Sequence, residues 1–179
     1  MDSLLVVGSS IFAQWRNAAA IAPGTPLINR AVGGTLTRDW VVSLPSVLTA
    51  TPPGAMLFYC GSNDINHGVT DSAIVANVMR CRAILAELAP DAPMAYFGII
   101  KAPQKVGHWT RIDRLNATIR AGLALNDLYV ESNDLFFHAG QPVARWFVED
   151  GLHLTDAAYA ALTTFVRPQV AAWRGLPHL

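Results

Sequence analysis

Five short apolar runs, each separated from the next by a stretch long enough for a helix, constrain the fold of this chain more than any other feature. The runs occupy residues 4–7, 26–29, 55–60, 94–100 and 127–130. Short continuous apolar runs are typical of parallel strands that helices cover on both faces. We therefore expect five strands, and the residues between them must supply the crossover connections.

Helical periodicity fills most of the intervening segments. The clearest helix is predicted to start at a Thr70–Asp71 cap and to stop at Pro90. Its expected apolar face carries Ile74, Val78, Cys81, Leu85 and Leu88. A later helix shows the same spacing at Ile112, Leu115, Ile119 and Leu123. A further helix is expected over residues 11–22, ended by Pro23 and Gly24.

The last helix is predicted to begin at a Thr155 cap. Its apolar residues are Tyr159, Leu162, Val166 and Val170. Pro168 should kink this helix or end it early, because proline lacks the backbone N–H that a helix interior needs.

Strands that alternate with helices predict an α/β fold, a parallel sheet with right-handed crossovers between two helical layers. At 179 residues, the chain suits one domain over residues 1–179. Ligands of such three-layer α/β/α sandwiches bind at the carboxyl ends of the strands. The loops that matter should therefore begin at Gly8, Asn29, Gly61, Lys101 and Glu131.

Composition excludes several classes of function. With 52% hydrophobic and 15% charged residues, the chain is not a disordered module. Thirteen basic residues balance thirteen acidic ones without a basic cluster, so neither nucleic acid nor an anionic membrane surface is expected as a partner. A small, uncharged substrate fits better. Cys60 and Cys81 fall in expected core positions, which indicates two reduced thiols.

The N-terminus enters an apolar run without a basic segment or a cleavage site, so we expect a cytoplasmic protein unless a leader was trimmed. No apolar stretch approaches the ~18–20 residues that span a bilayer, and no membrane span is expected. The apolar composition leaves a homo-oligomer open.

Serine residues follow the first strand. Ser10 opens a helix there, so its hydroxyl should lie at the carboxyl edge of the sheet near the N–H groups of a helix N-terminus, which suits a nucleophile. A plain helix cap by Ser9 or Ser10 is the alternative. No P-loop pattern is present.

Two further segments offer hydrogen-bond donors for a developing negative charge. Gly33 and Gly34 follow the second strand, where the backbone can approach a ligand closely. Asn63 follows the third strand and carries a neutral amide. Both segments would also make ordinary turns, so neither is decisive alone.

Asp150 precedes His153 by three residues, just before the last helix. This spacing allows the carboxylate to hold one ring nitrogen and leaves the other free as a general base. Asp64 and His67 repeat the spacing, so spacing alone does not choose the catalytic histidine. Two such pairs could also bind a metal, although no accompanying metal motif is present.

Taken in order, the four segments resemble the sequence blocks of the SGNH hydrolases, also called the GDSL family, and the similarity extends from Leu4 to about Val170. It is strongest to compact bacterial members whose first block reads Gly-Ser-Ser. Weaker agreement comes from residues 101–103 and 146–149. The resemblance implies a flavodoxin-like, five-stranded parallel sheet with strand order 2-1-3-4-5.

The resemblance also implies the roles of the residues. Ser10 becomes the nucleophile, Asp150 and His153 the pair that activates it, and the oxyanion donors are Gly34, Asn63 and the backbone N–H of Ser10. Ser9 stands where the family's namesake motif has aspartate, which leaves two adjacent hydroxyls as candidates.

The implied activity is cleavage of small, short-chain acyl esters through an acyl-enzyme, with neither cofactor nor metal. Two alternatives stay open. The acyl group could pass to an acceptor other than water, which would make the protein an acyltransferase, or the scaffold could be a binding module without catalysis.

Overall fold

A five-stranded parallel sheet forms the centre of the molecule in the computed structural model, which describes residues 3–175. Its strands are β1 (Leu4–Gly8), β2 (Leu27–Asn29), β3 (Ala55–Tyr59), β4 (Met94–Phe97) and β5 (Leu128–Val130). The order is β2-β1-β3-β4-β5 with parallel pairing throughout, so the predicted strands and their order are confirmed. β4 is shorter than expected and ends at Phe97.

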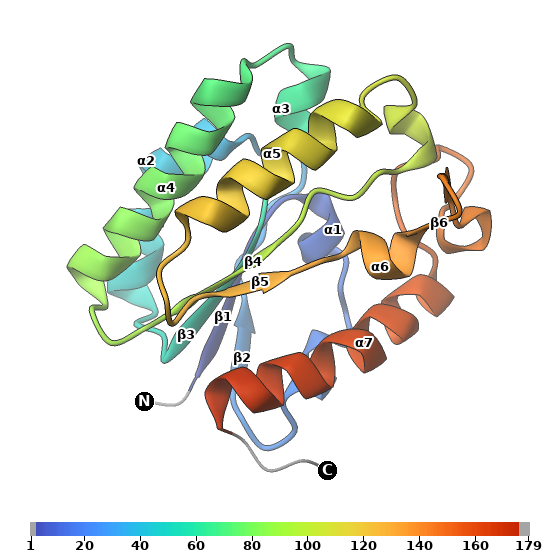
Figure 1. The fold of residues 1–179 in the computed structure, drawn as a ribbon. Coiled ribbons are helices and arrows are strands. Elements are labelled where there is room, and N and C mark those ends of the chain that lie inside the picture. The colour runs from blue at the N-terminus through green and yellow to red at the C-terminus, as the bar shows by residue number, and fades with distance from the viewer. Residues whose placement is uncertain (1–2, 176–179) are drawn as a thin grey trace.

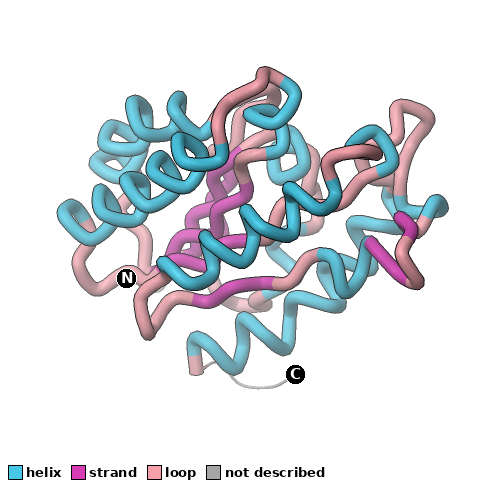
Figure 2. Tube along the Cα trace, turned by 45° about the horizontal axis from the view of Figure 1, so that its top comes forward, coloured by secondary structure: helices cyan, strands magenta, loops and turns pink. Residues whose placement is uncertain are grey.

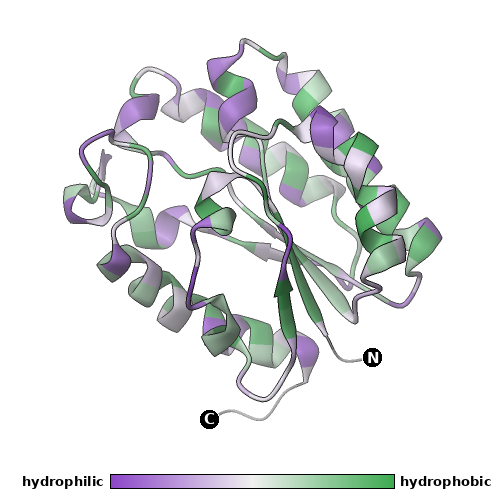
Figure 3. Ribbon diagram, turned by 180° about the vertical axis from the view of Figure 1, so that it is seen from behind, coloured by the Kyte–Doolittle hydropathy of each residue, from purple (hydrophilic) through white to green (hydrophobic). Residues whose placement is uncertain are grey.

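Helices cover both faces of the sheet (Figure 1). One layer contains α2 (Thr37–Ala50), α4 (Asp71–Leu88) and α5 (Trp109–Gly122), and the other contains α1 (Ser10–Ala13), the 3-10 helix η1 (Ala18–Ile21) and α7 (Asp156–Arg174). Alternate residues of β1 point into the two layers: Leu4 and Val6 into one core, Leu5 and Val7 into the other. The three-layer α/β/α sandwich is thus confirmed, and Figure 3 shows the most hydrophobic residues in its central strands.

The predicted helix over residues 11–22 is wrong. The chain forms the single turn α1, leaves helical geometry at Gln14 and resumes as η1. Phe12 and Trp15 are both almost fully buried, and the indole N–H of Trp15 donates to Thr163 Oγ1 at 2.9 Å. Burial of the Trp15 ring against α7 and of the Phe12 ring against Tyr59 and Phe97 of the sheet outweighs the local helical periodicity.

Helix α2 had no counterpart in the sequence analysis. Pro45 lies inside it, and a proline in a helix interior usually signals a break. Its buried face carries Trp40, Leu44 and Leu48 at helical spacing, a signal that the proline obscures.

The other helices mostly follow their predictions. Thr70 and Thr155 cap α4 and α7 through their side chains, as expected. Leu88 is 49% exposed and so lies off the buried face of α4. Of the two outcomes expected at Pro168, a kink or an early end, the early end is wrong, because α7 continues to Arg174. Tyr159, Leu162, Val166 and Val170 bury enough apolar surface to offset one lost backbone hydrogen bond.

Short elements complete the carboxyl edge of the sheet: α3 (Ser62–Asn66), η2 (Pro103–Lys105), α6 (Asn133–Phe136) and η3 (Ala144–Trp146). A small antiparallel hairpin, β6 (Phe137–His138) with β7 (Gln141–Pro142), was not predicted and lies apart from the central sheet (Figure 2). Cys60 and Cys81 are free and buried, as expected. Within residues 3–175, no helix is long and apolar enough to cross a membrane.

Candidate active site

The turn from β1 into α1 places Ser10 at the carboxyl edge of the sheet. Gly8 has φ +134°, and a Cβ there would lie 2.0 Å from the carbonyl oxygen of Tyr59, so only glycine fits between β1 and β3. Ser9 follows in an extended conformation, is buried, and donates its backbone N–H to Tyr59 O at 2.9 Å. Ser10 is the half-buried first residue of α1. The two adjacent hydroxyls therefore differ in accessibility, and Ser10 is the accessible one.

Side chains from distant parts of the chain hold this single helical turn in place. Asn29 Nδ2 donates to Phe12 O at 2.8 Å from the end of β2. The hydroxyl of Tyr159 in α7 donates to Ile11 O at 2.8 Å. A helix this short has little stability of its own, so these bonds fix the position of Ser10.

A tight turn before α7 presents Asp150 and His153. Phe147 pairs with Leu154 across it, and Val148 N donates to His153 O at 2.9 Å. Asp150 Oδ1 accepts the backbone N–H of Leu152 at 2.8 Å and that of His153 at 2.9 Å. The carboxylate thereby shapes the turn that carries the imidazole.

The second oxygen of Asp150 lies 2.6 Å from Nδ1 of His153. A carboxylate only accepts, so Nδ1 is the donor, and Nε2 of the neutral ring is left to accept a proton. The ring donor, then the backbone N–H groups of His153 and Leu152, lower the pKa of Asp150 to about 2. Asp150 is thus an anion at any ordinary pH.

Nε2 of His153 lies 3.0 Å from Oγ of Ser10, although the two residues are 143 positions apart. Three predicted residues from opposite ends of the chain are therefore connected in one line, from carboxylate to imidazole to hydroxyl. This is the arrangement by which an imidazole can take the proton of a serine hydroxyl.

The loop after β2 that carries Gly33 and Gly34, here called the glycine loop, lies beside Ser10. A Cβ on Gly33 would be 3.8 Å from that of Ser10, while Gly34 has φ +80° and open space at its Cα. The Thr35 hydroxyl donates to Val32 O at 2.9 Å and accepts the indole N–H of Trp40 at 3.0 Å. The loop is thus held with its backbone next to the serine.

Asn63 lies in the first turn of α3, at the end of the neighbouring strand. Its Nδ2 donates to the carbonyl oxygen of Thr35 at 3.0 Å, which ties α3 to the glycine loop. An amide nitrogen carries two hydrogens, so the second is left for a ligand.

In the second Asp-x-x-His pair, the side chains of Asp64 and His67 have different partners. Asp64 is fully buried, and its carboxylate accepts the backbone N–H and the hydroxyl of Thr37, the latter at 2.6 Å. His67 instead has Nδ1 2.8 Å from the carbonyl oxygen of Asn63. Within residues 3–175, no group of three His, Cys, Asp or Glu residues is placed to hold a metal ion.

One group beside the site was missed by the sequence analysis. The ammonium of Lys105 in η2 lies against α3, 2.8 Å from Ser62 O and 2.6 Å from Asn66 Oδ1. A lysine in a polar segment usually signals an exposed side chain, so no sequence signal pointed to its burial.

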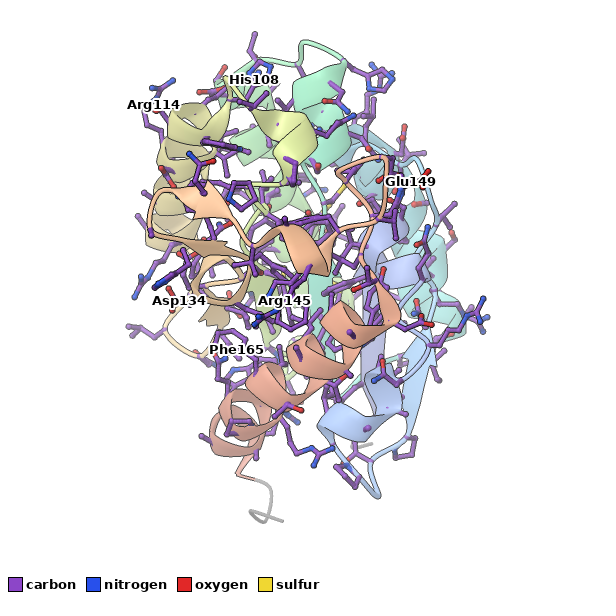
Figure 4. All side chains as sticks on the ribbon, turned by 90° about the vertical axis from the view of Figure 1, so that its right-hand side faces the viewer. His108, Arg114, Asp134, Arg145, Glu149 and Phe165 are labelled. Atoms are coloured by element: carbon purple, nitrogen blue, oxygen red, sulfur yellow. The ribbon has the colours of Figure 1, made fainter. Side chains whose placement is uncertain are left out.

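Several large aromatic side chains serve packing. Trp15, Trp40 and Phe147 are buried. Figure 4 looks onto the side that carries α7 and the turn before it, with the exposed Glu149 labelled next to Asp150 in sequence. His108, also labelled, is exposed at the end of the loop after η2.

Solved structures share this fold over nearly the whole chain. A GDSL-like lipase from Bacteroides thetaiotaomicron is 14% identical with a TM-score of 0.81, covering 96% of this chain and 88% of that one. A lipase/acylhydrolase from Enterococcus faecalis is 18% identical with a TM-score of 0.77, covering 96% of both chains. A catalytic mutant of an acetylxylan esterase from Geobacillus stearothermophilus is 14% identical with a TM-score of 0.75, covering 99% and 97%. At these identities the likeness concerns the fold.

No curated protein matches the sequence. The family model of the GDSL-like lipases and acylhydrolases does match it, over residues 6–161, a range that begins in β1 and ends inside α7 and so includes every residue of the Ser10 site. The chain belongs to the GDSL-like lipase/acylhydrolase family.

Proposed function

We propose that the protein is a serine esterase that cleaves small, short-chain acyl esters through an acyl-enzyme on Ser10. Membership of an acylhydrolase family supports ester hydrolysis in general. The single observation that carries the assignment is the hydrogen-bonded line from Asp150 through His153 to Ser10, with distances of 2.6 and 3.0 Å.

Acylation begins when Nε2 of His153 takes the hydroxyl proton of Ser10 and Oγ forms a bond to the ester carbonyl carbon. The carbonyl oxygen becomes an oxyanion, for which the backbone N–H groups of Ser10 and Gly34 and the free N–H of Asn63 Nδ2 are the donors. The bond to the alcohol oxygen then breaks, and the His153 imidazolium gives its proton to the departing alcohol.

Deacylation repeats these steps with water. Nε2 of His153 takes a proton from water, the hydroxyl oxygen attacks the acyl carbon, and the same donors hold the second oxyanion. The bond to Ser10 Oγ breaks, the proton returns to Oγ, and the carboxylic acid leaves. Asp150 stays ionised throughout and stabilises the imidazolium.

Short acyl groups are proposed because the glycine loop and the turn that carries His153 are closed by hydrogen bonds of their own. The glycine loop is closed by Thr35, and the turn of His153 by Asp150. A structurally similar protein is an acetylxylan esterase, which makes acetyl esters of sugars a reasonable first substrate class.

Ser10→Ala tests the proposal. We expect the rate of p-nitrophenyl acetate hydrolysis to fall by about 10⁴-fold or more, because the nucleophile is lost. The thermal midpoint should change little, since the half-buried hydroxyl caps no helix. Steady-state kinetics and a thermal melt measure both quantities.

Ser9→Ala is the matched control, because Ser9 is adjacent but buried and, within residues 3–175, forms no hydrogen bond with the imidazole of His153. Reaction with a fluorophosphonate followed by peptide mapping should label Ser10 in the wild type and in Ser9→Ala. Retained esterase activity in Ser10→Ala would refute the proposal. Absence of labelling in folded wild type would favour a binding module, and transfer to an added alcohol at the expense of free acid would favour an acyltransferase.

A further inference from the structure

Lys105 is a lysine with no exposed surface, in a chain that has only one other lysine, Lys101. Lysine is almost never fully buried unless its ammonium is paired. No ion pair within residues 3–175 involves Lys105, whereas Lys101 pairs with Asp113 at 2.9 Å. Burying an ammonium without a carboxylate costs free energy, so its contacts require an explanation.

The ammonium of Lys105 lies against both ends of α3. It donates to Ser62 O at 2.8 Å, in the peptide group that leads into Asn63. It also donates to Asn66 Oδ1 at 2.6 Å, at the last residue of the helix. α3 has five residues and little stability of its own, so a charged donor at both ends fixes its position.

The 3-10 helix η2, which carries Lys105, also contacts the turn that carries His153. Gln104 N donates to the carbonyl oxygen of Gly151 at 2.9 Å, between Asp150 and His153 in the chain. The side chains of Gln104 and Asn66 are also in contact, at 3.4 Å. The turn Pro103–Lys105 therefore touches the segment that carries Asn63 on one side and the segment that carries His153 on the other.

We propose that Lys105 is a positioning residue, whose buried ammonium holds α3 so that the Asn63 amide faces the oxyanion formed on Ser10. The proposal rests on the proposed esterase function for its kinetic consequences. Burial lowers the pKa of Lys105 to about 8, so the group is still largely an ammonium at pH 7.

A double-mutant cycle between Lys105→Met and Asn63→Ala tests this action. Methionine keeps an unbranched apolar chain of similar length and removes the ammonium. We expect Lys105→Met to lower kcat about 10–100-fold with KM within about threefold of wild type, and Asn63→Ala to lower kcat about 10²–10³-fold. If Lys105 acts through Asn63, the double variant is no more than about threefold slower than Asn63→Ala.

Lys101→Met is the matched control, because it applies the same substitution to the other lysine, which pairs with Asp113 and lies over the Phe137 ring. Its kcat should equal that of wild type. Multiplicative effects in the cycle, or an unchanged kcat in Lys105→Met, would overturn the positioning role. Should Lys105→Met fail to fold, Asn66→Ala replaces it in the cycle, because Asn66 is exposed and supplies one of the two acceptors.

A readout that does not depend on activity separates this proposal from the esterase assignment. The side-chain amide signals of Asn63 in a nitrogen–proton correlation spectrum are identified by their loss in Asn63→Ala. Lys105→Met, or Asn66→Ala, should shift these signals while Lys101→Met leaves them in place. Unmoved signals would refute the role of Lys105 whatever the activity, whereas a wild type that hydrolyses no ester would refute the proposed function and leave the spectrum to decide on Lys105.

Discussion

The carboxylate of Asp150 uses its two oxygens for different purposes. Oδ1 accepts two backbone N–H groups and so folds the turn, while Oδ2 accepts the ring N–H of His153. One side chain thus sets both the path of the backbone and the tautomer of the imidazole it carries. Replacing Asp150 should therefore have two separate effects, one on the conformation of the turn and one on the tautomer of His153.

Asp150→Asn should lower kcat at neutral pH by about 10³–10⁴-fold, because an amide favours the wrong imidazole tautomer. Its effect on stability should depend on pH. The folded pKa of Asp150 is lowered to about 2 from 3.8, so its stabilisation is fully present above pH 3.8 and is lost as the pH falls towards 2. Thermal melts should therefore show a steeper loss of stability for wild type than for Asp150→Asn across that window.

Glu149→Gln is the control, since it removes a neighbouring exposed carboxylate and should leave kcat unchanged. Parallel melting curves for wild type and Asp150→Asn between pH 4 and 2 would contradict the pairing of Asp150 with His153 in the folded state.

Among the elements, α2 depends on a side chain that belongs to another helix. Its first residue, Thr37, donates its backbone N–H and its hydroxyl to the buried Asp64 of α3, and Asn77 of α4 donates to the same hydroxyl. A carboxylate at a helix N-terminus satisfies otherwise unpaired N–H groups and opposes the helix dipole. The three helices are joined here next to Asn63.

Asp64→Asn should lower the free energy of unfolding by about 2 kcal/mol, because buried charge-assisted hydrogen bonds to Thr37 are lost. Urea unfolding followed by circular dichroism measures this loss. Asp39→Asn is a comparison at the same N-terminus of α2, because Asp39 accepts Leu36 N at 2.8 Å but is half exposed. Asp39→Asn should lower the free energy of unfolding by less than about 1 kcal/mol. Equal losses for the two variants would contradict the structural role of the buried Asp64 carboxylate.

In the molecule as a whole, most residues belong to the sheet and its two helical layers. The segments at the carboxyl edge are bound to that scaffold and to one another by hydrogen bonds such as Val32 N to Gly8 O and Gln104 N to Gly151 O. Hydrolysis of p-nitrophenyl esters should therefore be fastest for acetate and butyrate and decline for longer chains, which need an extended apolar surface. A panel of rising chain length measures kcat/KM, and a maximum at octanoate or decanoate would contradict this expectation.

Continuous apolar runs predicted the five strands, because buried parallel strands leave a strong signal of this kind in the sequence. Their order followed from the family resemblance. It failed where packing between distant segments decided the local structure. Phe12 and Trp15 break the expected helix after β1 because both rings are buried against distant segments, Phe12 against Phe97 and Trp15 against Thr163. The helix α2 escaped notice because Pro45 is tolerated inside it.

The candidate site likewise contains residues that could be predicted from the sequence and residues that could not. Ser10, Asp150 and His153 could be proposed from sequence because each follows a strand or precedes a helix in a recognisable block. Spacing could not separate Asp150–His153 from Asp64–His67, since only the fold buries Asp64 beneath α2. Lys105 could not have been proposed at all, because its role depends on burial.

Ser10 lies near the start of the chain and His153 near its end, in the turn that leads into α7, whose Tyr159 and Thr163 contact the segment just after Ser10. A ribosome makes these parts in that order. A nascent chain therefore carries Ser10, the glycine loop and Asn63 without a base until His153 has been added, and Ser10 becomes reactive only after α7 has emerged and docked. On the proposed mechanism, the Ser10 hydroxyl stays unreactive until the His153 turn and α7 have been made and have packed against α1.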